Sequence, residues 1–88
     1  MADKYKSVQH EVQAIQFNFD NLKSIYLFLG MKDVCYTIKN RTITGVVTGK
    51  NNEKLAVNKT DFVVKDKDEN VSVWKLDEFN KEFVKEVN

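Results

Sequence analysis

The sequence contains no proline, one cysteine, one histidine and only three glycines. The lone Cys35 cannot form an intramolecular disulfide, which suits a reducing compartment, and we interpret it as a small buried apolar residue. A single cysteine and His10 cannot supply the clustered ligands of a zinc site. There is no Gly-x-Gly-x-x-Gly motif or other glycine-rich phosphate loop. We therefore predict no metal site, no cofactor and no cofactor-binding residues.

Charge of one sign and long apolar runs are also absent. The chain has 14 basic and 13 acidic residues, so its net charge of +1 gives no overall attraction to nucleic acid or membranes. No apolar run approaches the roughly 20 residues of a membrane span. The first residues lead into no apolar signal-peptide segment. We expect a soluble cytoplasmic protein with no membrane partner.

The length of 88 residues predicts one small domain over residues 1–88, with residues 1–6 flexible. A hydrophobic fraction of 42% is enough for a globular core. A domain of this size has a thin core, and a deep cofactor pocket would compete with it for side chains. Nothing in the sequence places a base beside a nucleophile. We therefore predict that the protein is not an enzyme and has no catalytic residues.

The clearest periodicity predicts a helix over residues 20–30. Asp20 or Asn18 can cap its first turn, and Gly30 follows as a left-handed C-terminal residue. The apolar residues recur at i, i+3, i+4 and i+7, the spacing of one buried stripe. The stripe consists of Leu22, Ile25, Tyr26 and Leu29.

The other apolar segments predict strands. Residues 8–17 switch the parity of their apolar positions, which indicates a bulge or burial on both faces. Residues 34–39 and 42–48 flank a tight turn at Asn40-Arg41, and Gly45 indicates a bulge or a close backbone approach. Further strands are expected around Leu55 and Val57 and over residues 62–65 and 71–74.

Residues 76–87 permit either a helix or a strand. We expect one helical turn at 77–80 and then a final strand. The predicted fold class is α+β, a single domain with one main helix on a bent antiparallel sheet of five or six strands. The helix stripe should meet Ile15, Phe17, Val46, Phe62, Val64 and Trp74.

The basic residues are unevenly distributed. Residues 1–60 carry nine basic and five acidic groups, whereas residues 61–88 carry five and eight. The excess could be a solvated face or a rim that contacts phosphates. Tyr36 would be the base-stacking residue if it were exposed, but exposing it would bury Thr37, so we expect Tyr36 inward. The candidate nucleic-acid rim consists of Lys39, Arg41, Lys50, Lys54 and Lys59.

The C-terminal run is the expected edge of the sheet. An edge strand presents unpaired backbone groups, so it can pair with a partner or a second copy. The alternative is that these residues only cover the core of a monomer. The candidate protein-binding edge consists of Phe79, Phe83, Val84, Lys85 and Val87.

Four motifs in order carry a resemblance: the run 14–17 (Ala-Ile-Gln-Phe), the 20–30 helix, the run 60–64 (Thr-Asp-Phe-Val-Val) and the run 74–83 with its Leu-Asp-Glu-Phe. Together they resemble a family of small bacteriophage and prophage proteins of unknown function. The chain departs from that pattern at Thr60, where the family has glycine, and at Leu76, where it has proline. The resemblance implies a phage origin and an α+β fold, with no activity to transfer.

These observations predict a small non-enzymatic phage or prophage accessory protein. It would act in the host bacterial cytoplasm by binding a host or phage protein, as a monomer or homodimer. The alternative is a weak nucleic-acid-binding protein that uses the basic 39–59 region.

Overall fold

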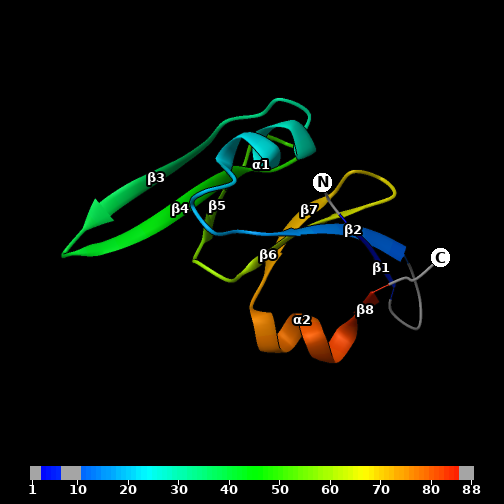
Figure 1. Cartoon of the computed structure of the whole chain (residues 1–88). Coiled ribbons are helices and arrows are strands. Elements are labelled where there is room, and N and C mark those ends of the chain that lie inside the picture. The colour runs from blue at the N-terminus through cyan, green and yellow to red at the C-terminus, as the bar shows by residue number, and fades with distance from the viewer. Residues whose placement is uncertain (1–2, 7–10, 86–88) are drawn as a thin grey trace.

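The computed structural model describes residues 3–6 and 11–85, whose helices and strands have the α+β arrangement shown in Figure 1. Two helices lie within these residues, α1 (Leu22–Phe28) and α2 (Leu76–Glu82). The strands of the same described residues are β1 (Asp3–Lys6), β2 (Glu11–Gln16), β3 (Val34–Lys39), β4 (Thr42–Thr48), β5 (Lys54–Val57), β6 (Phe62–Asp66), β7 (Val71–Trp74) and β8 (Val84–Lys85).

The strands form two antiparallel sheets, where the sequence predicted one bent sheet. The larger sheet has the order β7-β6-β2-β1-β8, and the smaller has the order β3-β4-β5. β2 pairs with β1 on one side and β6 on the other, so β3 cannot join it after α1. Residues 3–6, which lie in the segment expected to be flexible, form β1, in which Tyr5 pairs with Val12.

The β2 strand is buried on both of its faces, which explains its switch of apolar parity. Val12 and Ala14 belong to one core cluster, together with Phe79 of α2. Ile15 and Phe17 belong to a second cluster, together with α1 and the smaller sheet. The predicted contacts of the helix stripe are confirmed for Ile15 and Phe17 and wrong for the others. Phe62 and Val64 lie in the cluster with Phe79, Trp74 packs against that cluster, and Val47 rather than Val46 is buried against α1.

The α1 helix confirms three of the four predicted stripe positions. Ile25 and Leu29 are buried, and Leu22 is half-buried against them. Tyr26 is 37% exposed, so its assignment to the core is wrong. Phe28 packs against the cluster as well.

The structure confirms the predicted residue that ends α1 but not the predicted N-terminal caps. Gly30 has φ +75°, as predicted for the residue that ends the helix. The predicted N-terminal caps are wrong, because the capping position is Asn21 and its side chain makes no capping hydrogen bond. Asn18 Oδ1 instead accepts from the backbone N–H of Asp20, at 3.0 Å.

The ambiguous tail contains both a helix and a strand. α2 has seven residues, longer than the single turn expected, and places Phe79 in the core. The chain then continues extended at Phe83, which is also buried, into β8. Among the described residues, neither helix is long and apolar enough to cross a membrane.

Gly45 makes the close approach that the sequence indicated, with no bulge in the register of β4. A Cβ atom built at this position would lie 2.5 Å from Cζ of Phe17 and 2.8 Å from Cγ1 of Val57. The Phe17 ring is fully buried. Glycine at position 45 therefore makes the space that seats this ring against the smaller sheet.

Candidate protein-binding surface

The hairpin of β3 and β4 projects from the rest of the molecule, with its turn at the far end (Figure 1). Asn40 and Arg41 occupy the turn with φ values of 50° and 64°, the left-handed pair that a two-residue hairpin turn needs. The strand boundaries match the prediction, and Lys39 lies opposite Thr42. This hairpin is called the ribbon below.

One side of the ribbon continues the hydrophobic core outward. Val34 and Val47 face each other at its base, next to α1, and Val47 is fully buried. Farther out, Tyr36 is 53% exposed, Ile38 is 67% exposed and Ile43 is 47% exposed. Ile38 and Ile43 are direct cross-strand partners. These three residues, Tyr36, Ile38 and Ile43, are called the ribbon face.

Tyr36 lies on the same side of β3 as Val34, the side that meets the core at the base of the ribbon. The strand extends past the core, so the prediction that Tyr36 is buried is wrong. The ring contacts Phe19 edge to face, with centroids 6.3 Å apart. A seven-residue helix such as α1 is about 10 Å long, and a six-residue strand is about 20 Å long. α1 is therefore too short to cover the apolar side of the ribbon along its whole length.

The opposite side of the ribbon is mostly polar. Thr37 Oγ1 donates to the backbone oxygen of Thr44 at 3.5 Å, a long hydrogen bond between the two strands. Cys35 is exposed on this side, so its interpretation as a buried residue is wrong. The ribbon is thus amphipathic, and an uncovered apolar side bordered by polar groups is typical of interaction surfaces.

The tip of the ribbon is basic. Lys39 and Arg41 are exposed there, and the sequence has no acidic residue between Asp33 and Glu53. The other members of the expected nucleic-acid rim lie elsewhere.

Lys50 and Lys54 lie at the base of the ribbon, where Lys54 of β5 is the cross-strand partner of Thr48 of β4. Their ammonium groups are engaged, Lys50 Nζ with the backbone oxygen of Asp68 at 2.8 Å and Lys54 Nζ with Thr48 Oγ1 at 3.0 Å. The length of β4 separates them from the tip by roughly 20 Å. Lys59 lies in the loop between β5 and β6. The five residues therefore form no single phosphate track.

The expected C-terminal edge is present but short. β8 pairs with β1 at the end of the larger sheet, so Val84 and Lys85 do form an edge strand. Val84 is 69% exposed, whereas Phe79 and Phe83 are buried. These two aromatic residues hold α2 against the sheet and cannot also contact a partner. Val87 lies outside the described residues.

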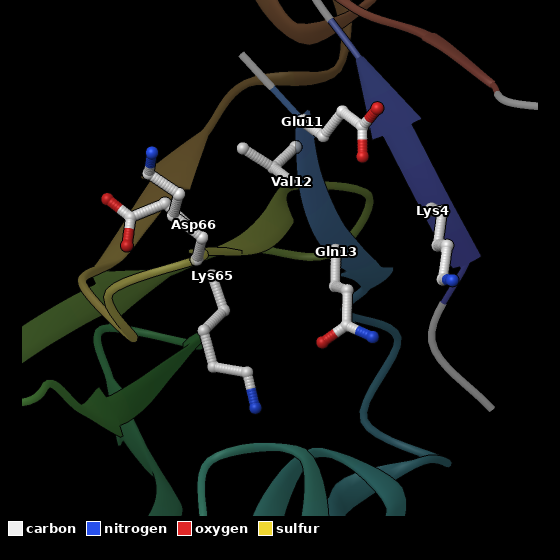
Figure 2. A pocket seen from close by; sticks show the side chains of 7 residues that line it. Lys4, Glu11, Val12, Gln13, Lys65 and Asp66 are labelled. Atoms are coloured by element: carbon white, nitrogen blue, oxygen red, sulfur yellow. The ribbon is translucent and has the colours of Figure 1, made fainter.

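A hollow of about 210 Å³ lies beside the paired strands β1, β2 and β6 (Figure 2). This is below the roughly 300 Å³ at which small-molecule pockets begin. Lys65 and Gln13 point toward α1 in Figure 2, while the carboxyl group of Asp66 points to the left of the view. Lys65 Nζ donates to the backbone oxygen of Phe28 at 2.7 Å and lies 4.7 Å from its ring centroid. The polar groups therefore do not converge on a ligand.

Asp66 organises the turn between β6 and β7. Its Oδ1 accepts from the backbone N–H groups of Asp68, at 2.8 Å, and Asn70, at 2.9 Å, and its Oδ2 accepts from Nδ2 of Asn70 at 3.0 Å. Partial burial raises the pKa of this carboxyl. The hydrogen bonds from Asn70 and Asp68 and the charge of Lys50 outweigh that effect and hold the pKa below its usual value. Asp66 is thus a structural group of the turn.

The described residues bring no three His, Cys, Asp or Glu side chains together around a metal position. Comparison with known proteins found no matching family model, curated protein or solved structure. The sequence predicted the hairpin itself but not the exposure of the ribbon face. The available signal was the difference in length between a hairpin with strands of six and seven residues and the short helix that had to cover it.

Proposed function

We propose that this protein is a non-enzymatic binding module whose docking surface is the ribbon face. The observation that supports the proposal is that Tyr36, Ile38 and Ile43 are exposed at neighbouring positions of one sheet face. Aromatic and large aliphatic side chains at the centre of a contact contribute most to protein–protein affinity.

The partner that suits this surface is a protein with an apolar patch bordered by acidic groups. Lys39 and Arg41 border the ribbon face at the tip, and the rest of the ribbon carries no acidic residue to oppose them. Complementary charges speed the encounter and orient the partner. The resemblance to small phage and prophage proteins supports an accessory role, with a host or phage protein of the bacterial cytoplasm as the partner.

Weak nucleic-acid binding is the second candidate. One observation favours it: Tyr36 is exposed on the same ribbon as Lys39 and Arg41, and two-stranded ribbons can enter a DNA groove. Two cations at the tip make few phosphate contacts, so such binding would be weak and strongly salt-dependent.

The test is affinity capture from bacterial lysate, with and without nuclease treatment, using two uncharged substitutions at neighbouring residues. Ile43→Asn removes an apolar side chain from the ribbon face, and Thr42→Asn changes the adjacent exposed residue on the opposite side. We expect a captured protein that is lost with Ile43→Asn and kept with Thr42→Asn. Equal capture by both variants would overturn the proposed surface, and capture abolished by nuclease would favour the second candidate.

A further inference from the structure

β3 is a long sheet edge without the usual protection. It is an outer strand of the smaller sheet, and no described strand lies on its outer side. Natural edge strands are commonly shortened or guarded by proline, bulges or charges. β3 has six residues, and its segment Val34–Ile38 carries no charge; the chain has no proline at all. Every residue of β3 after Val34 is exposed.

The hairpin geometry determines which backbone groups are free to pair. A two-residue turn makes its flanking residues, Lys39 and Thr42, a hydrogen-bonded pair. Hydrogen-bonded and non-hydrogen-bonded pairs then alternate along the ladder. The N–H and C=O groups of Val34, Tyr36 and Ile38 therefore point outward, away from β4.

We propose that two copies of the chain associate by antiparallel pairing of their β3 edges about a two-fold axis at Tyr36. In this register Tyr36 lies opposite Tyr36 of the second copy, and Val34 lies opposite Ile38. These are the residues whose backbone groups point outward, so the pairing can form about six hydrogen bonds. The two three-stranded sheets become one continuous six-stranded sheet.

The charged residues at the ends of β3 favour this register over the two registers in which the axis lies one residue away. With the axis at Tyr36, Asp33 of each copy lies opposite Lys39 of the other, at both ends of the paired segment. If the axis moved to Cys35 or Thr37, Lys39 would face Met31 or Cys35 and the pairing of charges would be lost. Opposite charges across a strand pair are favourable, and like charges are not.

The same register places the apolar sides of both ribbons on one face of the six-stranded sheet and their polar sides on the other face. Even-numbered residues of β3 carry the apolar side in both copies, so the two ribbon faces become one surface. Tyr36 pairs with Tyr36 at its centre, an aromatic cross-strand contact. This association is independent of the proposed docking surface, because it uses the edge of the ribbon and leaves the ribbon face open to a partner.

The first test measures the dissociation constant of the dimer by sedimentation equilibrium of the full chain. Asp33→Lys and Lys39→Asp each place like charges opposite each other twice per dimer. Each should weaken association roughly tenfold, while the double variant restores it. A wild-type chain that stays monomeric at high concentration overturns the proposal, and a dimer unaffected by the single charge changes overturns the register.

The second test uses the single cysteine. Cys35 would lie opposite position 37 of the second copy in a non-hydrogen-bonded pair, with Cα atoms about 4.5 Å apart, a separation that a disulfide can bridge. Thr37→Cys should give a covalent dimer on mild oxidation, whereas the matched variant Thr42→Cys, on β4, should not. Equal cross-linking of both variants overturns the register. Ile43→Asn should still dimerise, so failure of partner docking and failure of dimerisation are distinguishable.

Discussion

Replacing Gly45 with alanine should destabilise the domain, although the same change stabilises many exposed sites. The added methyl would meet two atoms of the Phe17 ring, at 2.5 and 2.9 Å, and Val57 at 2.8 Å. Phe17 is fully buried and packs edge to face on Phe19, with centroids 4.6 Å apart. The ring therefore has no open space to move into, and the strands must separate.

The expected change in the free energy of unfolding for Gly45→Ala follows from two opposing effects. Overpacking of a filled core costs about 1–3 kcal/mol. Loss of glycine freedom in the unfolded chain returns about 0.4–1 kcal/mol. The net loss should be about 1–2 kcal/mol, which lowers the Tm of a domain of this size by roughly 5–15 °C. Thermal and urea unfolding followed by circular dichroism measure both quantities.

A second substitution separates this mechanism from general damage to the strand. Phe17→Leu removes the ring atoms that the methyl would meet, so it should rescue part of the loss in Gly45→Ala, with a coupling energy above about 0.5 kcal/mol. Gly30→Ala is the matched control. Its added methyl meets no atom within 4 Å but strains a backbone with φ +75°, so Phe17→Leu should not rescue it. Unchanged stability of Gly45→Ala, or strict additivity with Phe17→Leu, would refute the reasoning.

Three other predictions follow from the same structure. Ile25→Ala should cost about 2–5 kcal/mol because Ile25 is fully buried, and a change below about 1 kcal/mol in urea unfolding would contradict its place in the core. The pKa of Asp66 is lowered in the folded state, so its contribution to stability is complete above the usual value of 3.8 and is lost as the pH falls through the folded pKa. Asp66→Asn should therefore lose less stability on acidification than the wild type, as followed by the urea midpoint at successive pH values. Any retention on DNA should be weak and salt-sensitive. Reversing the charge of Arg41 should reduce this retention more than reversing the charge of Lys54, because Lys54 lies about 20 Å from the tip. Equal effects of the two reversals in a salt titration would contradict the separation of the two residues.

The sequence predicted local elements better than their assembly. The turn at Asn40-Arg41 and the strands around it were predictable because a two-residue turn with alternating strands sets the register directly. The switch of parity in β2 also indicated burial on both faces. The placement of α2 was not predictable, because Phe79 and Phe83 satisfy both helical and strand spacing.

The division of the core into two clusters could not be predicted from the local sequence either. Phe62 and Val63 are adjacent, and alternation sends them to opposite faces of β6, yet nothing in their identities says which face meets which helix. The candidate surface depends on this same information. Tyr36 and Ile38 have the spacing of core residues, and only the distance that α1 can cover decides that they are exposed.

The double burial of β2 has a consequence for how the domain opens. The clusters beneath α1 and α2 share β2 and β6 as a common wall, so neither cluster can be lost without exposing a side of the strands that support the other. The two helices should therefore unfold together, and the amide protons of β2 and β6 should exchange with solvent only through global opening. The ribbon tip has no such support, and its amides should exchange through local fraying at a much lower free energy. The exposed residues near the tip of the ribbon should thus open independently of the two core clusters.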